Sequence, residues 1–265
     1  MHAMNHNDQM LRSERQRVII RAVDSGRRTI DELATLTGVS PISIRRDLTE
    51  LSEQGAIRRV RGGAAPAASR GAEYPFELRR GEDSDTKRAL AQVAASLIKP
   101  GDAVVIDNGT TALAVARQIT GIGITAMALS LHAAAAMAAQ HGNQVIVPGG
   151  TVDHDDLAFT SAGAAEAVGA MHFDFAIIGA CAADPDTGLT VAGWGDAQVK
   201  RAVLKASRRV ILVATADKFT RTAAHRFGTI HDLDTIVTTE DAPTAMIYDA
   251  RRAGVNVLFA EMPRA

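Results

Sequence analysis

VSPISIRRDL, residues 39–48, contains the first turns of a predicted helix that carries two adjacent arginines. Gly38 precedes this stretch and suits the left-handed residue that ends a helix. Ser40 is a preferred capping residue, and Pro41 suits the first position of a helix. The stretch therefore predicts a tight turn between two helices, the second of which begins near Pro41.

This second helix is predicted to bury one side. Its buried side holds Ile44, Leu48 and Leu51, which are spaced i, i+4 and i+7. At about 100° per residue, Arg46 points almost directly away from that side. The same outer face holds Ile42, Thr49 and Glu53, with Ser43 and Arg45 on its flanks.

The residues on either side predict a small helical unit with a basic hairpin. Residues 14–25 carry a helical stripe, and residues 29–37 begin with the capping-box pair Thr29 and Glu32. Residues 56–63 (AIRRVRGG) predict a short two-stranded wing with three arginines, Arg58, Arg59 and Arg61. Three short helices with a tight turn before the last form the helix-turn-helix plan, in which the last helix enters the major groove of DNA.

DNA binding would explain why these arginines are present, and the alternative is that they are merely solvated charges on the surface. Arginine on the outer face binds guanine bidentately, and wing arginines contact phosphates or the minor groove. Residues 1–63 hold 11 Lys and Arg against 8 Asp and Glu, whereas residues 64–265 hold 18 against 22. Because that excess is small, the combination of turn, cap, outward arginine and basic wing carries the prediction of DNA binding.

The fixed residues of this head also follow a known order. Residues 39–48 are followed by Leu51, Gly55, Arg58 or Arg59, and residues 62–64 (GGA). This order resembles the head of DeoR-family bacterial transcription regulators, whose pattern is V-S-x-x-T-I-R-R-D-L, a leucine, a glycine, a basic residue and G-G-A. By this resemblance the residues that contact operator DNA are Ser40, Ser43, Arg45 and Arg46, with Ser43 in the place of the usual threonine.

The remaining chain alternates strand and helix patterns. Its strand candidates are continuous apolar runs at residues 103–107, 145–147, 175–178, 210–213, 236–237 and 255–259. Such runs between helices predict a mostly parallel sheet covered on both faces. The expected fold is α/β, with a small N-terminal winged helix-turn-helix domain and a larger doubly wound, mostly parallel domain. The expected ranges are a flexible tail at 1–13, the DNA-binding domain at 14–63, a linker at 64–74 and an effector-sensing domain at 75–262.

One loop of the larger domain suits an anion. Asp107-Asn108-Gly109-Thr110-Thr111 lies between a predicted strand and a predicted helix, and ligands in such folds bind beyond the carboxyl ends of strands. Free N–H groups at the helix start, the helix dipole and two hydroxyls can hold a phosphate. An ordinary strand-to-helix turn with threonine caps remains an equal alternative. Neither the nucleotide triphosphate loop nor the dinucleotide fingerprint is present.

The resemblance to the DeoR family continues over this domain, through Ile178-Gly179-Ala180 and Lys218-Phe219 among other matches. It implies a fold like that of sugar-phosphate isomerases and a phosphorylated sugar or related metabolite as effector. The effector-binding residues that it implies are Lys87, Asp107, Gly109, Thr110, Thr111, Gly149, Gly150, Gly179, Asp196, Lys200 and Lys218. Without this resemblance, Lys200 would be assigned to a solvated helix face with Arg201 and Lys205.

Three departures from the family pattern favour an unusual sugar or polyol derivative. Of the family's usual T-N-S, only the serine has a match in this chain, Ser130. Thr215 replaces the aspartate of D-S-S-K. The acidic loop at residues 153–156 (DHDD) stands where many members have arginine, and it favours hydroxyls over phosphate. A metal there would need further ligands at defined spacing, so neither a metal nor a cofactor is expected. Trp194 covers the pocket or packs at an interface.

The composition favours a cytoplasmic protein. A single cysteine suits a reducing compartment, and the N-terminal residues lack an apolar secretory segment. Residues 118–152 contain no Asp, Glu, Lys or Arg. Polar residues and glycines interrupt this segment, so it does not provide the ~18 consecutive apolar residues of a membrane span.

These patterns predict a transcription regulator and not an enzyme. We expect a homo-oligomeric repressor of carbohydrate or polyol catabolism genes that binds double-stranded operator DNA under the control of a phosphorylated sugar or polyol. One alternative is an active sugar-phosphate isomerase with a DNA-binding appendage, but no paired acid and base for that reaction is evident. The other is a larger domain that serves only as an oligomerisation scaffold.

Overall fold

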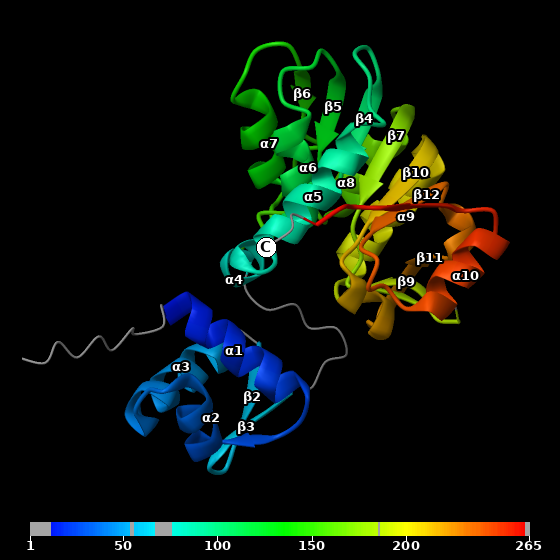
Figure 1. Ribbon diagram of the computed structural model, residues 1–265. Helices are drawn as coiled ribbons and strands as arrows, with labels where there is room; N and C mark the ends of the chain where they lie inside the picture. Colours follow the sequence, from blue (N-terminus) through cyan, green and yellow to red (C-terminus); the bar gives the residue numbers. More distant parts are fainter. Residues whose placement is uncertain (1–11, 54–55, 67–75, 185, 263–265) are drawn as a thin grey trace, which may run out of the picture. The chain divides into compact units, whose positions relative to one another are not determined.

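The computed structural model describes residues 12–53, 56–66, 76–184 and 186–262. The chain divides into two compact units, residues 1–82 and residues 83–265, which we call the head unit and the body unit (Figure 1). Most of the predicted tail and of the predicted linker lies outside the described residues. The predicted domain ranges therefore stay a prediction, and residues 76–81 group with the head unit.

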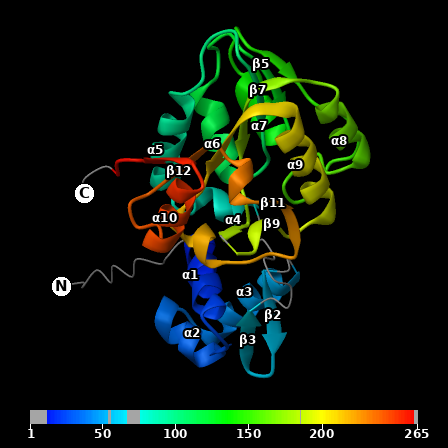
Figure 2. The same ribbon diagram turned by 90° about the vertical axis from the view of Figure 1, so that its right-hand side faces the viewer.

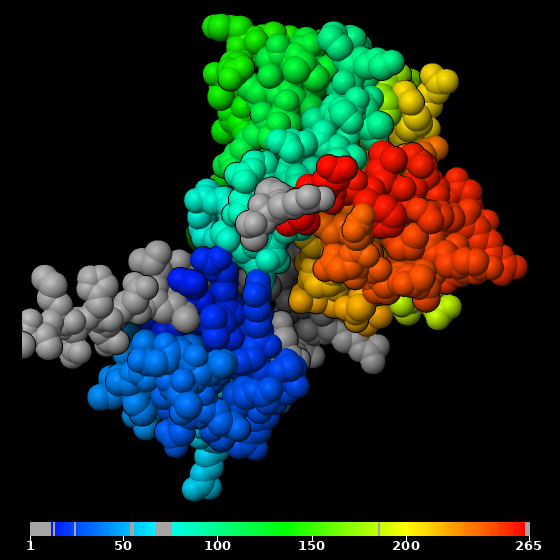
Figure 3. Space-filling model, in the orientation of Figure 1, coloured from blue at the N-terminus to red at the C-terminus, as the bar shows by residue number. Residues whose placement is uncertain are grey.

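The head unit has helices around a small antiparallel sheet of order β1-β3-β2. Its elements are α1 (Arg12–Asp24), β1 (Arg28–Thr29), α2 (Ile30–Thr37), α3 (Pro41–Glu53), β2 (Ile57–Val60), β3 (Gly63–Pro66) and α4 (Phe76–Gly81). The β2–β3 hairpin is the predicted wing, and its turn projects from the rest of the head unit in Figure 3. Strand β3 extends into the predicted linker because Pro66 still pairs with Ile57.

The helix signals of the head act as the sequence indicates. Thr29 and Glu32 form a capping box at the start of α2. Gly38 ends α2 with φ +71°, a conformation that glycine adopts without a steric penalty. Ile44, Leu48 and Leu51 are fully buried. The turn between α2 and α3 is therefore fixed by local chemistry and by burial of one side of α3.

The body unit alternates strands and helices along most of its length. Its elements are α5 (Ser84–Ala95), β4 (Ala103–Ile106), α6 (Thr110–Gln118), β5 (Thr125–Ala128), α7 (Leu131–Ala138), β6 (Gln144–Ile146), α8 (Ala162–Gly169), β7 (Phe173–Ile178), β8 (Ala182–Asp184), β9 (Gly188–Val191), α9 (Trp194–Ala206), β10 (Ser207–Val213), η1 (Ala216–Thr220), β11 (His225–Gly228), η2 (Ile230–Asp232), β12 (Thr235–Thr238), α10 (Thr244–Arg252) and β13 (Asn256–Phe259).

A seven-stranded sheet of order β13-β12-β10-β7-β4-β5-β6 forms the centre of the body unit, and every pairing in it is parallel. Helices α5, α6 and α7 contribute to the core on one face, and α8, α9 and α10 to the core on the other (Figure 2). The predicted fold class, a winged helix-turn-helix head with a doubly wound α/β body, is confirmed. Within the described residues, no helix combines the length and the apolar character needed to cross a membrane.

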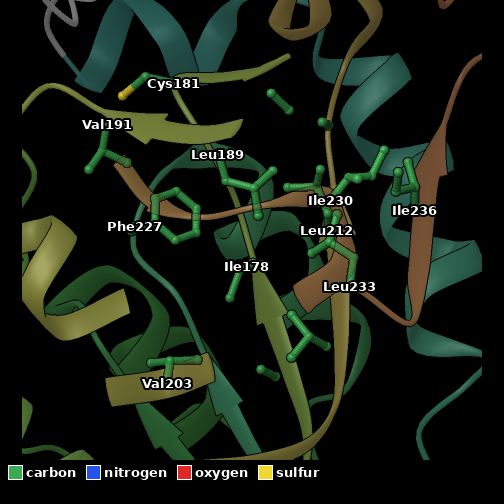
Figure 4. Packing of buried hydrophobic residues seen from close by; sticks show 14 of the residues in the cluster. Ile178, Cys181, Leu189, Val191, Val203, Leu212, Phe227, Ile230, Leu233 and Ile236 are labelled. Carbon is green, nitrogen blue, oxygen red and sulfur yellow. The ribbon is translucent and has the colours of Figure 1, made fainter. Parts of the chain in front are cut away.

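A second sheet of the body was not predicted. Strands β11, β9 and β8 form a three-stranded antiparallel sheet. Its side chains Leu189 and Phe227 pack beside Ile178 of β7 in a buried cluster (Figure 4). The Asp184 carboxylate closes the β8–β9 connection by accepting the N–H groups of Asp186 and Thr187, at 3.0 and 2.8 Å. Asp and Gly at this turn were the sequence signal for the hairpin.

Candidate functional site

The outer face of α3 presents the predicted DNA-contacting residues to solvent. Arg45 and Arg46 are exposed, while the opposite side of the helix is buried in the head core. Ser40 caps α3, because its hydroxyl accepts the Ser43 N–H at 3.2 Å. The two serine hydroxyls lie 3.1 Å apart. The head thus gathers Ser40, Ser43 and both arginines at the start of one helix, and their roles on DNA stay a prediction.

Asp47 fixes α3 against α1, a role that the sequence alone did not reveal. Its side chain is 1% exposed, and it accepts two hydrogen bonds from Arg15, at 2.7 and 3.3 Å. These bonds to the Asp47 carboxylate raise the pKa of Arg15 despite partial burial of the guanidinium. One turn further along α3, Glu50 accepts a hydrogen bond from Gln16 at 3.1 Å. The acidic residue after the two arginines therefore orients the helix that carries them.

The three wing arginines are exposed, but they have different surroundings. Arg59 donates to the Thr49 hydroxyl at 2.7 Å and to the backbone carbonyl of Arg45 at 3.3 Å. Its guanidinium thus joins the wing to α3. Arg58 lies on the same strand, and Arg61 lies in the hairpin turn. Of the three, Arg59 has the clearest structural role, so Arg58 and Arg61 are the better candidates for contacts with phosphate.

The wing also depends on a glycine. A Cβ atom added to Gly63 would lie 2.0 Å from the backbone oxygen of Arg28, in the neighbouring strand β1. No side chain fits at that distance, so only glycine allows β1 and β3 to pair there. The G-G-A sequence within the wing therefore reflects backbone packing in the head unit.

In the body unit, some of the predicted ligand residues lie at a reversal of the strand order. From β4 the chain builds β5 and β6 on one side, and it then returns to build β7, β10, β12 and β13 on the other. In open parallel sheets, ligands bind outside the carboxyl ends of the strands at such a point. Asp107 follows β4 and Gly179 follows β7, so the topology brings these two residues together.

Asp107 is a buried carboxylate with several partners. It is 2% exposed, and its Oδ2 accepts the Gly179 N–H at 2.8 Å. Its own N–H donates to the Ile177 carbonyl at 3.0 Å. Lys200, which is also 2% exposed, donates from Nζ to the same carboxylate. Lys200 is therefore buried, and it is not part of the solvated helix face to which it would be assigned without the resemblance.

Asp196 and Asn108 extend this ion pair toward the surface. The Asp196 carboxylate lies 3.6 Å from Lys200 Nζ, and it accepts a hydrogen bond from the Asn108 amide at 2.9 Å. Burial alone would lower the pKa of Lys200, but the Asp107 and Asp196 carboxylates outweigh burial and raise it. Lys200 is therefore a firmly protonated cation, and two carboxylates share its charge. We call Asp107, Asn108, Asp196 and Lys200 the carboxylate–lysine cluster.

The start of α6 lies directly beside this cluster. Gly109 precedes the helix with φ +92°, and it has no side chain to cap the first N–H groups. Thr110 and Thr111 occupy the first two positions of the helix, Thr110 buried and Thr111 half-buried. N–H groups at the start of a helix attract anions. The arrangement thus places anion-binding groups next to carboxylates that can accept hydrogen bonds from hydroxyls.

The other predicted effector residues lie farther along the sheet edge or on a covering helix. Gly149 and Gly150 follow β6, which is two strands, about 10 Å, from β4. A Cβ on Gly150 would lie 2.9 Å from Ser161 Oγ, so this glycine serves local packing. Lys218, after β10, has its Nζ 3.9 Å from Asp217. Lys87 is buried on α5.

Two further features of the sequence are Trp194 and the acidic loop at residues 153–156. Trp194 is 59% exposed and lies near Arg201, whose guanidinium carbon is 5.2 Å from the ring centre. Trp194 and Arg201 are seven residues apart and so share one face of α9. Asp196 and Lys200 lie on the opposite face, so Trp194 does not cover the cluster.

In the acidic loop, Asp153 accepts the N–H groups of Asp155 and Asp156, at 3.0 and 3.3 Å. Among the described residues, no group of three or more His, Cys, Asp or Glu is placed to hold a metal.

Comparison with known proteins gives the following similarities. The family model described as the DeoR-like helix-turn-helix domain matches residues 15–70, and that of the DeoR C terminal sensor domain matches residues 82–240. A glycerol-3-phosphate regulon repressor of Haemophilus influenzae is 34% identical over 241 residues, 90% of this chain and 93% of the relative. The HTH-type transcriptional regulator GlpR of Haloferax volcanii is 31% identical over 257 residues, 94% of this chain and 98% of the relative.

Solved structures are more distant. A ribose 5-phosphate isomerase A from Methanocaldococcus jannaschii aligns with a TM-score of 0.39 and 18% identity, over 52% of this chain and 55% of that one. A likeness at this level carries no argument about function. The two sequence relatives are regulators by name, in agreement with the prediction of a regulator and against the isomerase alternative.

Proposed function

We propose, because this chain belongs to the DeoR family of transcription regulators, that it represses genes of carbohydrate or polyol catabolism and releases its operator when it binds a phosphorylated sugar or polyol. The observation that carries the proposal is the exposed arginine face of α3, held in place by the buried Asp47 and joined to a basic wing. The names of the relatives support the sign of regulation and the class of regulon.

The head binds DNA through two kinds of contact. Arg46 points away from the buried side of α3 and donates to the two acceptors of guanine in the major groove. Arg58 and Arg61 contact phosphates from the wing, which fixes the position of α3 on the duplex without selecting the sequence. Ser40 and Ser43, at the start of α3, add hydroxyl donors close to the groove.

The body binds the effector with two neighbouring groups of residues, the start of α6 and the carboxylate–lysine cluster. The start of α6 holds the phosphate, because free N–H groups and the helix dipole favour an anion there. The carboxylate–lysine cluster holds two carboxylates against one ammonium, so its formal charge is negative. A phosphate is repelled by that charge, whereas sugar or polyol hydroxyls donate to Asp107 and Asp196. An effector with a phosphate at one end and hydroxyls at the other fits both parts.

The effector controls DNA binding by shifting the oligomer between two arrangements of its heads. Two heads on adjacent half-sites bind DNA more tightly than one, because the second contact is intramolecular. An effector can change operator affinity only by as much as its affinity differs between the two arrangements of the heads. Sedimentation of the full chain with and without effector measures the assembly that this mechanism requires.

The DNA half is tested with the full chain and its own promoter. Arg46→Ala should cost about 1–3 kcal/mol at one base pair and leave the other positions unchanged. Arg88→Ala removes an exposed arginine of the body unit, paired with Asp85 at 2.7 Å, and serves as the control of equal charge. Equal affinity of the wild type for promoter and random duplex at physiological salt would refute the proposal.

The effector half is tested by melting temperature against a panel of sugar and polyol phosphates. A ligand at 100 times its dissociation constant adds about 2.7 kcal/mol of stability. Thr110→Val with Thr111→Val should remove this shift and the release from DNA, while DNA binding stays intact. Thr125→Val, at the opposite end of the sheet, is the control. A double variant that still responds would show that the phosphate binds elsewhere.

A further inference from the structure

An isoleucine on the outer face of α3 is left largely outside the core of the head unit. Ile42 is 75% exposed, whereas the apolar residues Ile44, Leu48 and Leu51 of the same helix are 0% exposed. An exposed side chain of this size gains nothing from the hydrophobic effect in the free protein. Among the described residues of the head unit, Leu36 of α2 is the other large apolar side chain with comparable exposure, at 55%.

The position of Ile42 gives it a partner in the complex with DNA. It is the second residue of α3, within the N-terminal turn that contacts base edges in helix-turn-helix proteins. It precedes Arg46 by four residues, so both lie on the outer face of the helix. Two residues that follow it on the helix are polar or charged: Ser43 is hydrogen-bonded to Ser40, and Arg46 is exposed.

We propose that Ile42 recognises a thymine by packing against its 5-methyl group, and so sets the base preference beside the contact made by Arg46. This inference rests on the proposed function, since it requires α3 to enter the major groove. Isoleucine has no hydrogen-bonding group, and the thymine methyl is the one apolar group that a base presents in that groove. Cytosine at the same place would lose this contact and leave its amino group facing an alkyl chain.

The helix geometry also predicts where this thymine lies. Four residues of α-helix span about 6 Å along the axis. Stacked base pairs are about 3.4 Å apart, so 6 Å corresponds to about two steps. The thymine, on either strand, should therefore lie within about two base pairs of the guanine whose contribution is lost in Arg46→Ala.

The test uses the full chain and a library of random duplexes. Sequences enriched by the wild type are resynthesised with deoxyuridine in place of one thymine at a time, which removes only the methyl group. We expect one position to lose about fourfold in affinity, the factor that corresponds to burial of one methyl group, ~0.8 kcal/mol. Ile42→Ala should bind the thymine and deoxyuridine duplexes equally, with an unchanged melting temperature.

Two variants separate this contact from other effects. Arg46→Ala should still distinguish thymine from deoxyuridine at that position, because its side chain binds a different base. Leu36→Ala removes an exposed apolar side chain of the same unit outside α3, and it should keep the fourfold difference.

Two results would overturn the inference. The first is a wild type that enriches a sequence but responds to deoxyuridine at none of its thymines. The second is an Ile42→Ala protein that keeps the fourfold difference, and a change in its sedimentation would then place Ile42 at a contact with a second copy of the chain. Failure of the wild type to enrich any sequence would overturn the proposed function as well, so the two failures are distinguishable.

Discussion

Lys200→Met should destabilise the body unit strongly, because it removes the cation from a buried ion pair. Lys200 and Asp107 are each 2% exposed, so solvent screens their interaction very little. Removing one partner of such a pair costs about 3–5 kcal/mol, since the other charge stays buried. For a unit of 150–250 residues, about 2–4 °C per kcal/mol gives a fall in melting temperature of about 6–20 °C.

Calorimetry at neutral pH on the wild type, Lys200→Met, Asp107→Asn and the double variant measures this effect. The double variant should be more stable than Lys200→Met, because a neutral amide needs no cation. Lys205→Met changes an exposed lysine of the same helix and should shift stability by less than about 0.5 kcal/mol. A Lys200→Met protein as stable as this control would refute the assignment of a buried ion pair.

The pH dependence of the same pair has a definite sign. Because the carboxylates raise the pKa of Lys200 in the folded protein, the pair stabilises the fold fully below the ordinary pKa of 10.5. This stabilisation is lost as pH rises through the higher folded pKa. As pH rises from neutral, the stability difference between wild type and Lys200→Met should therefore shrink only in strongly alkaline solution, and a difference that disappears between pH 7 and 9 would contradict the sign.

Three further predictions concern the head unit. Gly63→Ala should destabilise it by about 1–3 kcal/mol in calorimetry, since the new Cβ would lie 2.0 Å from a backbone oxygen of β1. Asp47→Asn should cost about 1.5–3 kcal/mol, because it weakens the bonds from Arg15, and DNA affinity should fall with it in anisotropy titrations. Arg58→Ala should lower the salt dependence of DNA binding by about one phosphate contact, whereas Arg59→Ala should lower the melting temperature of the head, because Arg59 is bonded to α3.

The helices of the head followed from local signals in the sequence. Gly38 and Ser40 act through contacts within a few residues, so their effect does not depend on the remaining chain, and the spacing of Ile44 and Leu48 marks the side of α3 that packs into the head core. The partner of Asp47 could not be predicted in this way. Arg15 lies 32 residues earlier, and only the packing of α1 on α3 brings the two together.

Six strands of the body's parallel sheet followed from continuous apolar runs, whereas β5 was not among the strand candidates and the order of the strands could not be predicted. Residues 182–191 gave too short a signal to be recognised as β8 and β9, although the turn at Asp184 closes their hairpin. The helix containing Lys200 was predicted as a pattern, but the burial of Lys200 could not be predicted, because burial depends on which strands lie beneath the helix.

The sequence by itself determined the capped helices, the arginine face and the alternation of strand and helix, because these depend on residues near one another in the chain. Only the tertiary structure decided that Asp107 meets Lys200, 93 residues later, where the order of the strands reverses. A parallel sheet carries its connections across its faces, so the neighbours of a strand end are chosen by the topology and not by distance along the chain.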